Sequence, residues 1–330
     1  RIEQNNLKDL SSMVEFVCGA ENMAYGDSIK VVLYKNQKKE MTAHKKIWGL
    51  YEVGNVTVKD AQGTHTKSFL LGTKQSSNTA LYLADLNKAL TYANNTSIKG
   101  NASLPKLGLK KSKSGVTQQS PVNGKIEISS NNLPKLNQEI IDEQFSYLSQ
   151  LPLSSPISTD SLIQSFSEET LIISSSQSMS INNKILRGNI IVASSQDVYV
   201  SRNCNIEDII VYAKNIQVED GFKGSAQLFA LDTIIIGKNS NFEYPSAIGV
   251  LQPKERYNQP ILIDVQERSI VKGTVFMYTE AGSIEKKLLS LDKNTLVLGN
   301  VYADSFLQTK GEIWGEVACS KFRLITSSSI

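Results

Sequence analysis

The first twenty residues carry apolar side chains at the three- and four-residue spacing of an amphipathic helix. The residues that share this apolar face are Leu7, Leu10, Met13, Val14 and Val17. Gly19 follows the last of them, and glycine commonly ends a helix because it adopts left-handed conformations without strain. The spacing therefore predicts a helix over residues 1–20.

The next apolar runs show the alternation or continuity that is typical of β-strands. They cover residues 28–34, 46–53, 55–59 and 67–71. Polar turns separate them, and the charged run at 35–39 predicts a solvated hairpin tip. Together with the helix, these strands predict a small N-terminal α+β domain over residues 1–78.

Short apolar pairs such as Leu81/Leu83 and Leu90/Tyr92 continue through residues 79–109, with Asn-Asn and Gly-Asn turns between them. No helical stripe crosses these turns, so short strands are expected. We predict that this range is an early part of the repeat described below.

Residues 110–184 differ from their surroundings. The basic, polar stretch at 110–120 predicts an exposed loop, and an amphipathic stripe between Pro134 and Pro152 predicts one helix. The apolar positions of that helix are Leu136, Ile140, Ile141, Phe145 and Leu148. We expect this range to be a helix-containing insertion or connector.

Residues 185–330 repeat one phrase: a short apolar strand, a polar corner, a second short strand, and a corner with Gly, Asn or Asp. The phrase begins at Gly188, Asp208, Ser225, Gly273, Gly299 and Gly315. Such internal repetition is typical of a solenoid, and the β-branched residues favour strands over helices. We predict a mainly β fold, a parallel β-helix of triangular section. An antiparallel sandwich, which also has many short strands, is the alternative.

The repeat resembles the bactofilin family of polymer-forming bacterial β-helices. The segment from Gly299 through Gly311 to Cys319 carries the clearest similarity, and 188–237 a looser one, within the range 185–326. The resemblance implies a structural, envelope-associated protein. This chain departs from the family in its N-terminal domain, its insertion and its bulky corners. These departures argue against the head-to-head filament assembly of the family.

Composition limits the classes of function. The chain has 330 residues, 40% of them hydrophobic and 20% charged, which suits a folded protein with a buried core. Its net charge of +3 is too small to predict a nucleic-acid partner. No apolar run is long enough to span a membrane.

Candidate chemistry is sparse. His44 and His65 are the only histidines, and Cys18, Cys204 and Cys319 lack the paired spacing of a zinc site. The sequence has no phosphate-binding glycine loop and no serine elbow or paired histidine for a catalytic triad. We therefore predict a non-enzymatic protein with no catalytic residues, no cofactor and no metal, and we expect both histidines to face solvent.

Two surfaces are candidates for binding. Asp264, Glu267, Arg268 and Lys272 form the densest charged group of the repeat and are the candidate glycan-binding face. The repeat runs to residue 326 without a cap, so we expect its last rung either to be covered by residues absent from this chain or to be a self-association surface. Its apolar contacts are Phe322, Leu324 and Ile325.

These observations favour a β-helical scaffold or stalk of the bacterial cell envelope, with a protein partner or a second copy bound at the β-helix end. A carbohydrate-active or glycan-binding β-helix is the alternative. The chain opens on Arg1 and not on methionine, which fits a removed signal peptide, a removed anchor or a trimmed N-terminus. With the envelope role, we expect an upstream segment that anchors the protein extracytoplasmically to a membrane.

Overall fold

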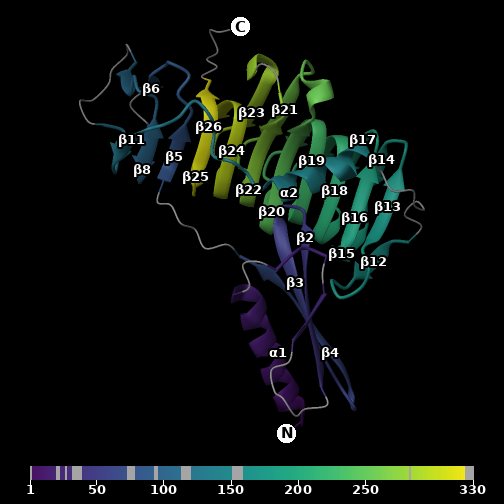
Figure 1. The fold of residues 1–330 in the computed structure, drawn as a ribbon. Coiled ribbons are helices and arrows are strands. Elements are labelled where there is room, and N and C mark those ends of the chain that lie inside the picture. The colour runs from purple at the N-terminus through teal and green to yellow at the C-terminus, as the bar shows by residue number, and fades with distance from the viewer. Residues whose placement is uncertain are drawn as a thin grey trace. The chain divides into compact units, whose positions relative to one another are not determined.

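The computed structural model describes residues 2–19, 23–26, 28–31, 39–72, 79–92, 96–112, 120–150, 159–281 and 284–323. The fold is mainly β and divides into two compact units (Figure 1). The first unit is Arg1–Gln75 with Gln164–Leu171, and the second is Ser76–Ile163 with Ile172–Ile330.

The first unit contains one helix and an antiparallel sheet in the order β1-β2-β3-β4. Its elements are α1 (Ile2–Gly19), β1 (Ser28–Val31), β2 (Glu40–Trp48), β3 (Tyr51–Asp60) and β4 (Gly63–Leu71). The apolar face of α1 packs on the sheet through Leu10, Met13 and Val17, against Met41 and Val56. The predicted N-terminal helix is therefore confirmed.

One predicted strand of this unit is wrong. Residues 46–53 do not form a single strand, because the chain turns at Gly49 and Leu50 and returns as β3. Gly49 has φ of 63°, a left-handed conformation that favours glycine and permits this tight hairpin. The predicted hairpin tip at 35–39 lies outside the described residues except for Lys39.

The remaining elements belong mainly to the second unit. They are β5 (Thr79–Leu83), β6 (Leu90–Tyr92), β7 (Ile98–Lys99), β8 (Asn101–Leu104), β9 (Leu109–Lys111), β10 (Val122–Asn123), β11 (Ile126–Ile128), α2 (Gln138–Ser149), β12 (Ser161–Gln164), β13 (Leu171–Ser175), β14 (Met179–Ile181), β15 (Ile185–Gly188), β16 (Ile190–Ser194), β17 (Asp197–Val200), β18 (Asn205–Val218), β19 (Lys223–Ile236), β20 (Asn241–Gln252), η1 (Lys254–Arg256), β21 (Ile261–Val265), β22 (Ile270–Thr279), η2 (Ile284–Lys286), β23 (Lys287–Leu291), β24 (Leu296–Thr309), β25 (Glu312–Trp314) and β26 (Val317–Phe322).

Most strands of the second unit form one sheet of parallel strands that closes on itself. Each strand pairs with a strand about one repeat further along the chain, and we call each such repeat a rung. The alignment places equivalent side chains in columns, one of which is Val192, Val211, Leu228, Ile248, Val275 and Val301. All six are at most 1% exposed and form part of the core. The prediction of a mainly β repeat is confirmed, and its pairings are parallel, which excludes the antiparallel sandwich for this region.

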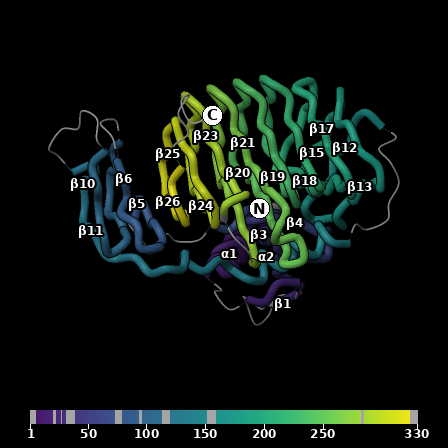
Figure 2. Tube along the Cα trace, turned by 90° about the horizontal axis from the view of Figure 1, so that it is seen from above, coloured from purple at the N-terminus to yellow at the C-terminus, as the bar shows by residue number. Residues whose placement is uncertain are grey.

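The last rung of the repeat is covered by an early segment of the chain. Strand β26 pairs in parallel with β5, so that Val317 aligns with Leu81 and Cys319 with Leu83. Strand β5 in turn pairs with β8, and β8 with β11. Figure 2 shows this order in space, since the blue strands follow the yellow ones. Strands β5 and β8 therefore join the sheet beside its last rung, whereas β6 pairs with β9 and β7 with β10 in two separate two-stranded sheets.

The predicted insertion at 110–184 needs correction, because strands β11 to β14 lie within it and belong to the parallel sheet. Its predicted helix is confirmed as α2, which Asn137 caps by accepting a hydrogen bond from the Glu139 N–H. Buried Gln144 of α2 accepts a 2.6 Å hydrogen bond from the Tyr212 hydroxyl. Tyr147 stacks on the same ring. The helix thus covers the outer face of β18.

Three glycines stack at one corner of successive rungs. Gly273 aligns with Gly299, and Gly315 follows on the next rung. A Cβ atom on Gly299 would lie 1.9 Å from the carbonyl oxygen of Gly273, and its φ of 145° disfavours other residues. Only glycine lets neighbouring backbones approach this closely.

We predict that Gly299→Ala lowers the free energy of unfolding by about 3 kcal/mol, through backbone strain and steric overlap. Urea denaturation measures this change. The control is Gly72→Ala, because a Cβ on Gly72 meets nothing within 4 Å. Equal stability of the two variants would contradict the close approach of the rungs.

Candidate functional site

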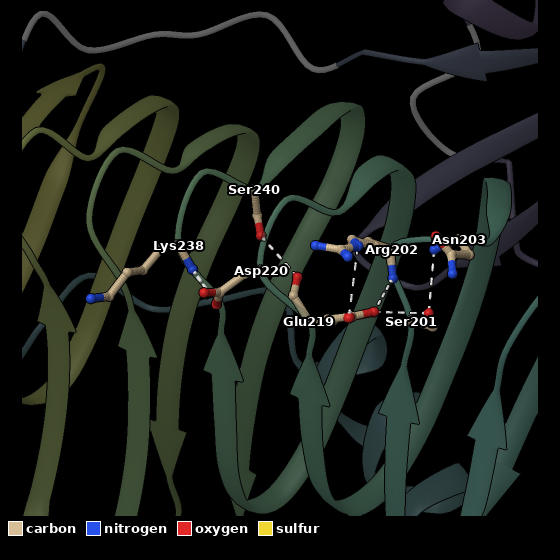
Figure 3. Close-up of polar contacts among 7 residues, drawn as sticks. All are labelled: Ser201, Arg202, Asn203, Glu219, Asp220, Lys238 and Ser240. Carbon is tan, nitrogen blue, oxygen red and sulfur yellow. Dashed lines mark hydrogen bonds and ion pairs between the residues drawn. The ribbon is translucent and has the colours of Figure 1, made fainter.

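Five short loops align along one edge of the stack, and we call them together the polar corner. They follow the aligned strand residues Val200, Val218, Ile236, Val265 and Leu291. The loops cover residues 201–204, 219–222, 237–240, 266–269 and 292–295. The side chains drawn in Figure 3 come from the first three loops.

The third residue of four of these loops has a left-handed backbone. Gly221, Asn239, Arg268 and Asn294 have φ between 56° and 81°. This conformation turns the chain sharply, and it suits glycine and asparagine best. The N–H of Gly221 donates to the carbonyl of Lys238 at 2.7 Å, and that of Asn239 to Glu267 at 3.0 Å. The corners therefore continue the rung-to-rung hydrogen bonding of the strands.

Glu219 joins two rungs of the polar corner (Figure 3). Its carboxylate accepts hydrogen bonds from the Arg202 backbone N–H at 2.9 Å and from the Ser201 hydroxyl at 2.8 Å. The Arg202 side chain lies 3.8 Å away. These donors stabilise the carboxylate and lower the pKa of Glu219 below its ordinary value.

The next rungs repeat this arrangement with other residue types. Asp220 accepts from the Lys238 backbone N–H at 2.9 Å. The hydroxyl groups of Ser240 and Ser269 both donate to the carbonyl of Gly237, at 2.7 and 3.0 Å. Ser240 and Ser269 are at most 1% exposed, so these bonds satisfy polar groups inside the corner.

Charges of opposite sign follow one another along the polar corner. The second loop residues are Arg202, Asp220, Lys238, Glu267 and Lys293. Neighbouring parallel strands are about 4.8 Å apart, so each charge has opposite charges on adjacent rungs. The ion pair between Arg202 and Glu219 joins the first two of these loops directly.

The polar corner is not evident as a site from the sequence. The visible repeat lies in the apolar strands, whereas the corner emerges only when the residues after each strand are aligned. The loop at 253–260 lengthens one rung and hides the constant spacing. The signal that remains is a pair of similar phrases, GKNS at 237–240 and DKNT at 292–295.

The four residues of the candidate glycan-binding face have different surroundings. Glu267 and Arg268 belong to the polar corner, where the Arg268 Nε donates to Asn239 at 2.8 Å. Lys272 forms a 2.6 Å ion pair with Glu243 on the preceding rung. Asp264 lies on β21 and is half-buried. Three of the four thus contribute to contacts between rungs.

The predicted self-association surface at the end of the repeat lies beside another strand of the same chain. Strand β5 pairs with β26 from Val317 to Cys319, so the backbone edge of this rung is occupied there. Phe322 aligns with Leu307 and is half-buried. The other two predicted contacts, Leu324 and Ile325, lie outside the described residues.

The histidines and cysteines are dispersed. His44 lies on β2 and His65 on β4. Both are half-buried, whereas the sequence predicted that they face solvent. Cys204 and Cys319 are buried free thiols, whereas Cys18 is exposed. Within the described ranges, no three His, Cys, Asp or Glu side chains are grouped closely enough to hold a metal ion.

A buried lysine lies at the start of strand β23. Lys287 is 1% exposed, and its ammonium group donates to the Ala281 carbonyl at 2.9 Å. Burial lowers the pKa of Lys287, although the charge of Asp304 opposes this effect. Asp304 itself accepts hydrogen bonds from Thr279 and Ser320, on the rungs before and after its own. The two hydrogen bonds of Asp304 thus also join neighbouring rungs.

A comparison with protein families, with curated proteins and with solved structures finds no match for this chain. Among the described residues, no helix has both the length and the apolar character needed to cross a membrane.

We predict that Glu219→Gln destabilises the protein near neutral pH and that this difference disappears in acid. The stabilisation by a carboxylate with a lowered pKa is present above its unfolded-state pKa and is lost as pH falls through the folded-state value. Thermal unfolding of both proteins as a function of pH measures the difference. The control is Glu127→Gln, at an exposed position of β11. A difference that stays constant down to acidic pH would refute the role of the Glu219 charge.

Proposed function

We propose that the parallel sheet is a β-helix of triangular section and that the protein is a structural scaffold. The observation that carries this proposal is the use of polar side chains for bonding between rungs. Ser201–Glu219 and Asp208–Ser225 are two such pairs, at 2.8 and 2.9 Å. A chain whose polar side chains bond neighbouring rungs in this way is suited to form a stiff structural element.

The register within a rung supports the triangular section. The pairing of β18 with β19 is interrupted between Ile206 and Ile209 and again between Ala213 and Asn215. These two interruptions divide the rung into three straight segments. Asp208, at the first interruption, has φ of 60°, which suits a sharp corner.

We also propose a place for this scaffold in the bacterial cell envelope, where it assembles with further copies. The similarity of the repeat to bactofilins supports assembly. The columns of buried aliphatic residues support a long-lived, rigid element.

Glycan binding is the second candidate, favoured by one exposed aromatic residue. Trp314 is 66% exposed on β25, and its indole N–H donates to Glu312 at 3.0 Å. It aligns with half-buried Leu298, which aligns with Lys272. An exposed ring beside a carboxylate is suited to stacking against a sugar, and Lys272 lies two rungs away in the same column.

We predict that the chain self-associates and does not sediment with insoluble polysaccharide. Sedimentation velocity at increasing concentration should show species heavier than the 36.4 kDa chain. A co-sedimentation assay with cellulose, chitin and peptidoglycan provides the comparison, with Trp314→Ala as its control. A strictly monomeric chain that binds one of these polymers through Trp314 would replace the scaffold by the glycan-binding function.

A further inference from the structure

The strands from β5 to β11 form a unit that is paired within itself. We call it the cap segment; its described residues are 79–92, 96–112 and 120–128. Strand β5 pairs with β8 and β8 with β11, while β6 pairs with β9 and β7 with β10. The cap segment therefore has its own stacked rungs before it meets the rest of the sheet.

The junction between the cap segment and the last repeat rung is short. It aligns Val317 with Leu81, Ala318 with Tyr82, and Cys319 with Leu83. By contrast, β22 and β24 are aligned continuously from Ile270 to Met277. The junction is nevertheless well fitted, because Leu81, Leu83 and Cys319 are at most 5% exposed.

The chain that leaves the cap segment is long enough to let it move as a unit. Residues 129–132 are hydrogen-bonded to the cap segment, through Leu104, Tyr82 and Asp85. Residues 133–137 then join it to α2 without helix or strand, and five extended residues span about 17 Å. Helix α2 has its own attachment to the repeat through the hydrogen bond between Gln144 and Tyr212. This attachment of α2 does not depend on the junction between β26 and β5.

We propose that the edge of β26 is an assembly surface whose partner is the cap segment of a second copy of this chain. In the closed monomer, the chain's own β5 occupies this edge. Two copies that exchange their cap segments form the same aligned strand pairs, so each pairing that opens within one chain forms again between two chains. The ratio of closed monomers to exchanged dimers then depends on the protein concentration.

This proposal deepens the scaffold function and rests on it, since exchange supplies a specific route to self-association. An uncovered β26 would expose the N–H and C=O groups of an edge strand together with buried Cys319. The β5 strand of another copy is complementary to this edge residue by residue. Exchange around more than two copies would give open chains of scaffold.

The aligned native thiol of Cys319 provides the test. Leu83→Cys places a second thiol on the adjacent strand, at the spacing that permits a disulfide. The exposed thiol is removed by Cys18→Ser in the same chain. The protein is unfolded, refolded at low or high concentration, oxidised, and run on a non-reducing gel. The matched control adds Cys319→Ala.

We expect an intramolecular disulfide after dilute refolding and an intermolecular dimer that increases after concentrated refolding. The control should give neither product. Intramolecular disulfides alone at every concentration would overturn exchange; the scaffold function would still stand if sedimentation showed assembly by another surface. Monomers in both experiments would overturn both proposals.

A second position guards against a failure of Leu83→Cys to fold. Leu81→Cys with Val317→Cys tests the other end of the junction, in a chain that also carries Cys18→Ser and Cys319→Ala. The same concentration dependence is expected. Absence of any disulfide at both positions would overturn the pairing of β26 with β5 and the proposal with it.

Discussion

In-register parallel pairing between successive rungs is the interaction on which the rest of this structure depends. It satisfies the backbone groups of each strand with those of its neighbours, and it places equivalent side chains directly above one another. Interior aliphatic residues thereby form continuous columns, and corner residues meet their counterparts at a fixed separation. The loop at 253–260 respects this constraint, because Ile234 and Ile263 remain aligned although the loop lies between their rungs.

The same constraint determines where polar groups are placed. Side chains at corners are close to the equivalent corners of adjacent rungs, so serine, aspartate and glutamate find partners there without distorting a strand. Asp304 contacts the rungs on both sides of its own. Tyr212 shows the corresponding solution on a flat face, since its hydroxyl group is buried by α2 and satisfied by Gln144. A partly satisfied group would cost stability in such surroundings.

Local periodicity in the sequence was sufficient to predict both helices and the repeated short strands. Leu10, Met13 and Val17 are close in sequence, and their spacing alone specifies the buried face of α1. The pairing of Leu83 with Cys319 has no such local signal, because its two strands come from opposite ends of the repeat-containing chain. The polar corner has a partial signal in the sequence, weaker than that of α1 and stronger than that of the β5–β26 pairing. Its loops resemble one another, but inserted residues change their spacing, and only the register of Val218, Ile236 and Val265 brings them together.

The position of β5 beside β26 has a consequence for the order in which the protein is made. A ribosome synthesises the cap segment well before the strand that it covers, since more than two hundred residues separate Leu81 from Val317. The repeat rungs can stack as they emerge, each on the one before, because their contacts are sequential. The cap segment can pair with the repeat only after the last of these rungs has been synthesised. Completion of the sheet is therefore a late, non-local event, and the nascent chain carries an unpaired β5 edge until its C-terminal rung has been released.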